Sequence, residues 1–160
     1  MKTVYLSLGS NLGDREANLR AALERLEPRR VSPIYETSPV DFTAQPFFLN
    51  MVVEAETDLM PQQYLAKTQR IERELGRVRG VPAKGPRSID IDILMFDTRL
   101  IHSVNLEVPH PRLHERRFVL VPLADLAPDL RHPVTGRSVR EMLNALPEAD
   151  LVQPWKPPVW

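Results

Sequence analysis

The chain has 160 residues, of which 42% are hydrophobic and 26% charged, which is typical of a globular protein of one domain. Its 21 basic and 21 acidic residues cancel, so we expect no nucleic-acid partner and no membrane partner, because both call for a basic excess. The absence of cysteine excludes disulfides and thiolate chemistry. The start is too quickly polar for a signal peptide and no apolar run would span a bilayer, so we expect a cytoplasmic protein.

The first third of the chain predicts a strand, a helix and two further strands. Residues 3–8 alternate between apolar and polar side chains and run into a Gly-Ser-Asn turn. Asp14 is placed to cap a helix with one leucine stripe, which Pro28 closes. Strands are expected over 31–36 and 47–56, with a proline-containing loop between them.

The rest of the chain predicts a second helix, a fourth strand and a mixed C-terminal part. The second helix runs over 61–75, with Pro in its first turn and Gly just past its end. A loop over 77–86 leads into a strand that ends at Phe96. Helical character returns over 115–126, and a capping box starts a last short helix over 138–146.

This order of elements predicts an α+β fold. Strand, helix, strand, strand, helix, strand is the ferredoxin-like β-α-β-β-α-β core, an antiparallel sheet with helices on one face, here with an added C-terminal β/α segment. We expect one domain over 1–150, followed by an extended proline-rich tail over 151–160 that takes no part in catalysis. The open face of the sheet should display Phe48, Asn50 and two aspartates.

Those aspartates, Asp90 and Asp92, are the most informative pair in the chain. In the strand that contains them, both carboxylates are expected on one face, and the other face is expected to carry Ile89, Ile91, Ile93 and Met95. Same-face neighbours on a strand are roughly 6.5–7 Å apart. Carboxylates this close repel one another unless a cation lies between them, and Mg²⁺ prefers such oxygen ligands. With arginines just upstream, the pattern suits a nucleoside triphosphate.

The same pattern has a plainer interpretation, which single motifs do not exclude. A bare Asp-x-Asp is more often the solvated face of a strand, and Phe48 with Asn50 also fits a strand packed on both sides. The chain contains neither a Gly-x-x-x-x-Gly-Lys-Ser/Thr loop nor Gly-x-Gly-x-x-Gly. Nucleotide binding would therefore use another scaffold, with arginines of segment 77–87 and Arg116 around the phosphates.

Several segments, taken together in order and spacing, resemble the 6-hydroxymethyl-7,8-dihydropterin pyrophosphokinase family of folate biosynthesis. The resemblance covers about residues 4–146, and the Gly-Pro-Arg-x-x-Asp-x-Asp-x-Leu block is its most diagnostic part. The segments are Leu8-Gly-Ser-Asn-Leu-Gly13, Tyr35-Glu-Thr-Ser-Pro39, Phe48-Leu-Asn50, Gln69-Arg-Ile-Glu72, Gly76-Arg-Val-Arg79, Gly85-Pro-Arg-Ser-Ile-Asp-Ile-Asp-Ile-Leu94 and Val108-Pro-His110 with Arg116 and Phe118.

The resemblance implies an enzyme that transfers pyrophosphate from ATP to the pterin hydroxymethyl group and releases AMP. Two Mg²⁺ ions would be held by Asp90 and Asp92, and Arg77 and Arg87 would join them in catalysis. The expected ATP-binding residues are Gln69, Glu72, Arg79, Lys84, Arg87, His110 and Arg116. The expected pterin-binding residues are Ser38, Pro39, Val40, Phe48, Asn50, Asp90 and Phe118. ATP and the pterin would be the only partners of a monomer.

Two departures and two alternatives accompany this hypothesis. Ala83 and Lys84 stand where the family often has an arginine and an aromatic, and Pro111 stands where a tyrosine is common. A Mg²⁺-dependent phosphohydrolase or nucleotidyltransferase would consume ATP without the pterin. A binding module that uses the open sheet face would show no Mg²⁺-dependent ATP binding.

Overall fold

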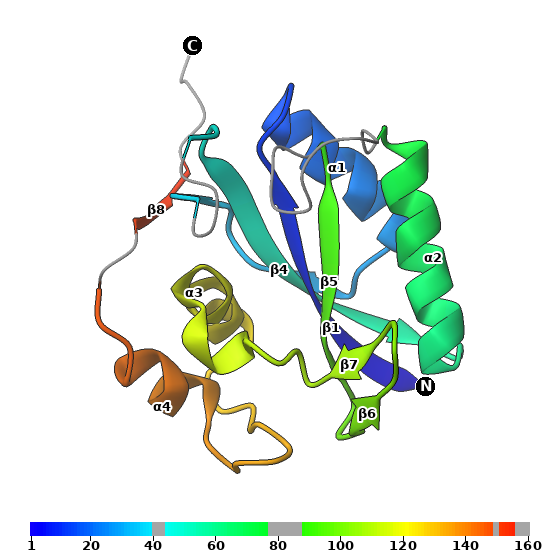
Figure 1. Cartoon of the computed structure of the whole chain (residues 1–160), viewed down its shortest axis with the longest axis vertical. Coiled ribbons are helices and arrows are strands. Elements are labelled where there is room, and N and C mark those ends of the chain that lie inside the picture. The colour runs from blue at the N-terminus through cyan, green and yellow to red at the C-terminus, as the bar shows by residue number, and fades with distance from the viewer. Residues whose placement is uncertain (40–43, 77–87, 149–150, 156–160) are drawn as a thin grey trace.

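The computed structural model describes residues 1–39, 44–76, 88–148 and 151–155, in which helices lie on both sides of a twisted sheet (Figure 1). The strands are β1 (Lys2–Ser10), β2 (Arg30–Val31), β3 (Tyr35–Thr37), β4 (Phe48–Thr57), β5 (Asp90–Phe96), β6 (Ile101–His102), β7 (Glu107–Val108) and β8 (Val152–Pro154). The helices are α1 (Arg15–Leu26), α2 (Pro61–Glu74), α3 (Arg117–Leu126) and α4 (Val139–Asn144), with a 3-10 turn η1 (Leu113–Glu115).

The main sheet has the order β5-β1-β4-β3-β8, with β2 on β4, and all its pairs are antiparallel. The first four strands in that order, with α1 and α2, form the expected ferredoxin-like core, so the predicted fold class is confirmed. β6 and β7 pair separately. No helix within the described ranges is long and apolar enough to cross a membrane.

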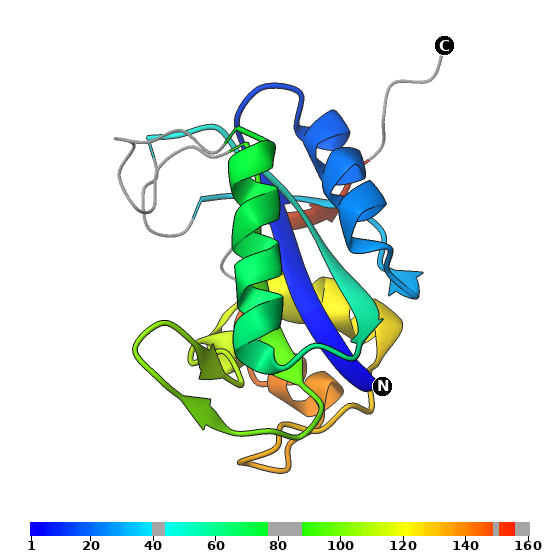
Figure 2. The same cartoon turned by 90° about the vertical axis from the view of Figure 1, so that its right-hand side faces the viewer.

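Helices α1 and α2 cover one face of the sheet, as expected (Figure 2). Leu19 and Ala22 of α1 and Ile71 of α2 enter a core with the inward residues of β1, β4 and β5. The cap predicted for α1 is confirmed, because the Asp14 side chain accepts a hydrogen bond from the Ala17 N–H at 3.1 Å. Such a cap contributes about 1 kcal/mol.

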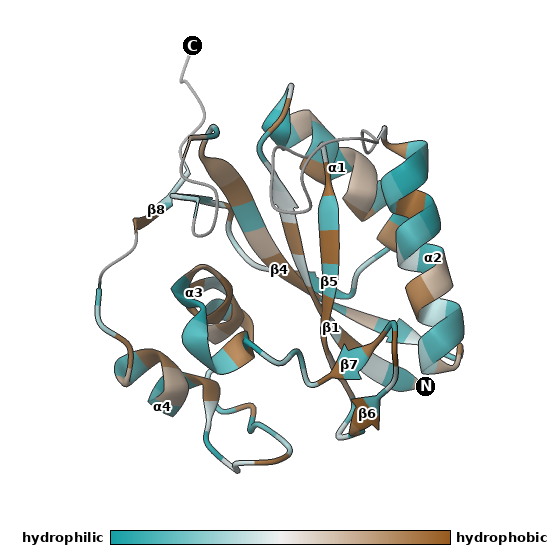
Figure 3. Ribbon diagram, viewed as in Figure 1, coloured by the Kyte–Doolittle hydropathy of each residue, from teal (hydrophilic) through white to brown (hydrophobic). Residues whose placement is uncertain are grey.

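The opposite face is not open along its whole length, which corrects the expectation of helices on one face only. Helices α3 and α4 pack on it around Val52, Leu94, Leu120 and Met142, which belong to a second buried cluster. Figure 3 shows alternating hydrophilic and hydrophobic bands along β5. The capping box predicted at Ser138 is present and starts α4.

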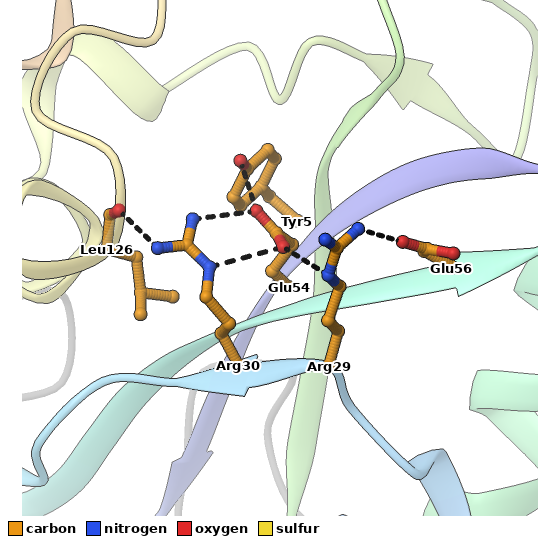
Figure 4. A network of polar contacts seen from close by, with 6 residues as sticks. All are labelled: Tyr5, Arg29, Arg30, Glu54, Glu56 and Leu126. Atoms are coloured by element: carbon orange, nitrogen blue, oxygen red, sulfur yellow. Dashed lines mark hydrogen bonds and ion pairs between the residues drawn. The ribbon is translucent and has the colours of Figure 1, made fainter.

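A polar network fastens the far end of α3 to the sheet (Figure 4). The buried Glu54 carboxylate accepts hydrogen bonds from the Tyr5 hydroxyl at 2.7 Å and from Arg30 at 2.9 Å. Arg30 also donates to the Leu126 carbonyl at 3.0 Å. These bonds lower the pKa of Glu54, with the Arg30 hydrogen bond as the largest cause. The network therefore helps to fix the position of α3 relative to the sheet.

Four local predictions need correction. The strand expected over 31–36 is two short strands, because Pro33 lies between them and has no N–H to donate. Phe47 precedes β4 and is exposed instead of facing the core. A bulge in β5 places Met95 in the α3 cluster, on the face opposite Ile93. The glycine of the expected turn after the first strand lies inside β1, which continues to Ser10.

Candidate active site

One row of residues across the sheet brings the predicted pterin and metal positions together. Gly9 of β1 pairs with Asn50 of β4 on one side and with Asp90 of β5 on the other. Directly paired residues point their side chains to the same face. Neighbouring strands lie about 4.8 Å apart, so the backbones of Asn50 and Asp90 are about 10 Å apart. Only a glycine lies between them in this row, so no side chain of β1 separates Asn50 from Asp90.

The lack of a side chain at Gly9 leaves room for the Asn50 amide and the Phe48 ring. A Cβ atom on Gly9 would lie 2.7 Å from Nδ2 of Asn50 and 3.4 Å from Cδ1 of Phe48. The first distance is well inside the 3.5–4.0 Å at which non-bonded heavy atoms are most favourable. Any larger residue at this position would push the Asn50 amide, whereas glycine leaves room for it.

The Asn50 amide has a defined orientation. The buried Thr37 hydroxyl of β3 donates a hydrogen bond to Oδ1 of Asn50. Since Oδ1 is the acceptor in this bond, Nδ2 is the end of the amide that can donate to a ligand. Phe48, two residues earlier on the same face of β4, is half-buried. A fixed amide beside an aromatic ring suits a flat heterocycle that offers hydrogen-bond acceptors at its edge.

Asp90 and Asp92 lie at the edge of the sheet, on β5, and both are half-buried. Between them, the Ile91 N–H donates to the buried Glu72 carboxylate of α2 at 2.9 Å. This bond ties the edge strand to α2 and limits the movement of both aspartates. Glu72, which is predicted to contact ATP, therefore also holds β5, the strand that carries Asp90 and Asp92.

The two carboxylates fit a magnesium site that is completed by substrate. Within the described residues, no group of three or more His, Asp or Glu side chains gathers around a common point. Mg²⁺ is usually held by one or two carboxylates together with waters and substrate phosphates, and only rarely by a cage made of protein alone. Asp90 and Asp92 could therefore hold Mg²⁺ when ATP is bound.

His110 is positioned beside Asp90 as a neutral hydrogen-bond donor. Its backbone N–H donates to the Leu94 carbonyl at 2.9 Å, and its Nδ1 accepts from the Arg112 N–H at 3.2 Å. Burial, aided by the charge of Arg116, lowers the pKa of His110 from 6.5 to about 4, and the negative charge of Asp90 opposes this shift. At neutral pH the ring is uncharged, with its proton on Nε2.

Arg116 and Phe118 lie at the start of α3, on the same side of the sheet. The Arg116 guanidinium is 5.5 Å from the centre of the Phe118 ring, and both side chains are half-buried. The ring therefore faces a cation on one side. The positive charge of Arg116 also lowers the pKa of His110, on which the negative charge of Asp90 acts in the opposite direction.

The structure describes some of the remaining predicted site residues and not others. Ser38 follows β3 and is half-buried, Pro39 is buried, and Gln69 is exposed on α2 one turn before Glu72. Five predicted site residues lie outside the described residues, and their roles stay predictions: Val40, Arg77, Arg79, Lys84 and Arg87.

Sequence reasoning missed two residues of the site, Gly9 and Thr37. Both lie within the family-like segments, but Gly9 was assigned to a turn and Thr37 to no role. A local signal does exist for Thr37, which is followed by Ser-Pro at the end of a short alternating run. Gly9 becomes visible only when strand pairing places it opposite Asn50 and Asp90.

The chain is similar to known folate-pathway proteins. A family model described as 7,8-dihydro-6-hydroxymethylpterin-pyrophosphokinase matches residues 5–128. The 2-amino-4-hydroxy-6-hydroxymethyldihydropteridine pyrophosphokinase of Bacillus subtilis is 48% identical over 138 residues, covering 82% of each chain. The corresponding protein of Pseudomonas aeruginosa is 46% identical over 153 residues, covering 92% of this chain and 93% of that one.

Other similar proteins are much longer. The folic acid synthesis protein fol1 of Pneumocystis carinii is 43% identical over 155 residues, which is 94% of this chain but 21% of that protein. The chain thus spans about a fifth of that relative. A crystal structure of wild-type Plasmodium falciparum HPPK-DHPS with SDX-DHP aligns with a TM-score of 0.70 at 19% identity, over 90% of this chain and 43% of that one. At this identity the likeness shows the fold alone. The family match and the full-length bacterial relatives show that this chain belongs to the 7,8-dihydro-6-hydroxymethylpterin-pyrophosphokinase family.

Proposed function

We propose that this chain transfers the pyrophosphoryl group of ATP to the hydroxymethyl group of 6-hydroxymethyl-7,8-dihydropterin. The products are AMP and the pterin diphosphate, in a step of folate biosynthesis. The observation that best supports this proposal is the row Asn50–Gly9–Asp90, which places an oriented amide and a carboxylate on one face of the sheet with only a glycine between them. Family membership supports the same reaction.

The pterin side of the site is built from β4, β3 and α3. Asn50 donates from Nδ2 to the edge of the heterocycle, because its Oδ1 is already bonded to Thr37. Phe48 and Phe118 hold the two faces of the ring, and the backbone at Ser38 and Pro39 completes the edge contacts. The flat ring is thereby oriented before it reacts, which removes much of the entropic part of the barrier.

The nucleotide side lies around β5, where the charges of Arg116 and Asp90 both act on the neutral His110. His110 donates from Nε2 to an oxygen of the nucleotide, and Arg116 places a positive charge where negative charge develops. Gln69 and Glu72 on α2, together with Arg79, Lys84 and Arg87, are assigned to ATP by the family resemblance, and Arg77 is assigned to catalysis on the same basis.

Two Mg²⁺ ions on Asp90 and Asp92 would neutralise phosphate charge and lower the pKa of the attacking hydroxyl. The hydroxymethyl oxygen bonds to the β-phosphorus, and the bond from that phosphorus to the oxygen bridging the α-phosphorus breaks. AMP leaves with this oxygen, and the proton of the hydroxymethyl group is released to solvent. The chain contributes positioning and electrostatic stabilisation, as other phosphoryl-transfer proteins do. ATP and the pterin are the partners we propose, for a protein that works as a monomer.

Product analysis tests this proposal. The protein is incubated with Mg²⁺ and ATP, with and without 6-hydroxymethyl-7,8-dihydropterin, and nucleotides and pterins are separated by chromatography. AMP and pterin diphosphate should form in equal amounts, and only when the pterin is present. ATP consumption without the pterin would instead favour a phosphohydrolase or nucleotidyltransferase, and the absence of Mg²⁺-dependent ATP binding would favour a binding module.

A further inference from the structure

The C-terminal strand β8 lies directly against the strand that leads into the pterin-binding loop. β8 pairs with β3 in the register Thr37–Val152, Glu36–Gln153 and Tyr35–Pro154. Without β8, the three-residue strand β3 would form the edge of the sheet, with one side unpaired. A strand this short, bonded along one side only, is weakly held. β8 therefore adds the second ladder that fixes Thr37.

The contact continues beyond the strand into the loop itself. The Ser38 N–H donates to the Leu151 carbonyl at 3.1 Å, and the Leu151 N–H donates back to the Ser38 hydroxyl at 3.2 Å. Ser38 is the first of the three loop residues assigned to the pterin. Thr37, the residue before Ser38, orients the Asn50 amide. The tail therefore contacts the loop directly, at Ser38, and Asn50 indirectly, through Thr37.

Trp155 anchors this segment. Its backbone N–H donates to the Ile34 carbonyl at 2.8 Å, and its half-buried indole packs against the core under α1. The Arg15 guanidinium lies 5.2 Å from the centre of the indole, where the cation is attracted by the ring. The same guanidinium donates to Glu36 of β3 at 2.8 Å and to the Phe47 carbonyl at 2.9 Å. Trp155 is thus linked to β3 and to the residue before Phe48.

We propose that residues 151–155 are a positioning element for the pterin side of the site, an inference that rests on the proposed function. They hold β3 in the register in which Thr37 orients Asn50 and Ser38 starts the loop. This differs from the expected role of the tail as an extended segment without part in catalysis. β3 also pairs with β4, and Tyr35 bonds to Asp125 of α3, so β3 keeps other attachments and the effect of losing the tail contact is graded.

Three variants separate positioning from general stabilisation. Trp155→Ala removes the indole anchor. Trp155→Phe keeps an aromatic ring and removes the indole N–H, which finds no hydrogen-bond partner in the described part of the chain. Gln153→Ala is the matched control, because its exposed side chain lies in the same strand. The melting temperature of each variant is measured first. The KM values for the pterin and for ATP are then measured well below that temperature.

We expect Trp155→Ala to raise the KM for the pterin about three- to tenfold, the equivalent of one hydrogen bond that is no longer well placed. The KM for ATP should stay unchanged, and both Trp155→Phe and Gln153→Ala should behave as wild type. A lower melting temperature with both KM values unchanged, or an equal rise in both, would overturn the proposal.

If Trp155→Ala does not fold, Arg15→Gln breaks the contact between the Arg15 guanidinium and Trp155 instead. The same selective rise in the pterin KM is expected for this variant. An unselective or absent effect would overturn the proposal. If the wild-type protein forms no pterin-dependent AMP, the proposed function fails, and the positioning role falls with it. An active wild type with no selective effect in the variants refutes positioning alone.

Discussion

The substitution Gly9→Ala tests the geometry of the site with a single added carbon atom. The new Cβ would lie 2.7 Å from Nδ2 of Asn50, about 1 Å closer than a relaxed contact allows. Gly9 has no positive φ, so alanine fits its backbone conformation. The clash can be relieved only by moving the Asn50 side chain, which the Thr37 hydroxyl holds in place.

The structure gives the expected magnitudes. Overpacking typically costs about 1–3 kcal/mol, and replacing a glycine of ordinary conformation returns about 0.4–1 kcal/mol by restricting the unfolded chain. The net loss of folding stability should therefore be no more than about 2.6 kcal/mol. Pterin binding should weaken as well, because a displaced Asn50 amide loses its hydrogen bonds to the ring, worth about ten- to hundredfold in affinity.

Calorimetry and thermal unfolding measure these effects separately. Affinity for the pterin is measured in the presence of a non-hydrolysable ATP analogue, and affinity for the analogue is measured alone. We expect the first to fall and the second to stay unchanged. In an Asn50→Ala background, Gly9→Ala should no longer reduce stability, since the clashing amide is gone. Unchanged pterin affinity, or equal loss of both affinities, would refute the role of Gly9 in the placement of Asn50.

Three further predictions concern the metal, the histidine and the polar network. Asp90→Ala should abolish turnover at saturating Mg²⁺ and ATP and change the melting temperature little, whereas turnover at the wild-type rate would show that this carboxylate does not bind the metal. The pKa of His110 falls from 6.5 in the unfolded chain to about 4 in the folded protein, so its contribution to stability is present above pH 6.5 and is lost as the pH falls towards 4. Urea unfolding without ligands measures this loss. Between about pH 7.5 and pH 5, the free energy of unfolding of the wild type should fall by at most about 2 kcal/mol more than that of His110→Asn. Identical losses would contradict this shift. Tyr5→Phe should lower the free energy of unfolding by about 1 kcal/mol, because Glu54 keeps its bonds to Arg30; both KM values should stay unchanged, and a selective change in either would mean that the network reaches the site.

Local patterns predicted much of the fold. Alternation in β1, β4 and β5, the leucine stripe of α1 and the caps at Asp14 and Ser138 all depend on near neighbours in the sequence, and the structure confirms them. The face of Met95 was predicted wrongly because one extra residue in β5 inverts the alternation beyond it. A bulge depends on the partner strand, which the local pattern does not contain.

Long-range pairing explains what was missed at the site. The motif residues Phe48, Asn50, Asp90 and Asp92 could be named from the sequence, but not the register that sets Asn50 and Asp90 on either side of Gly9. The pairing of the tail with β3 joins opposite ends of the chain, and a proline-rich composition gave no sign of it. The α3 packing over half of the sheet likewise follows from tertiary contacts.

The fate of a labelled β-phosphate tests the central claim most directly. ATP carrying ¹⁸O on the non-bridging oxygens of its β-phosphate is incubated with Mg²⁺, the dihydropterin and the protein, and the products are resolved by phosphorus NMR, in which ¹⁸O shifts the signal of the phosphorus that carries it. Transfer of the intact pyrophosphoryl group places the label on the phosphorus bonded to the pterin oxygen and leaves AMP unlabelled. Labelled ADP, or label released as inorganic phosphate without any pterin product, would contradict the account.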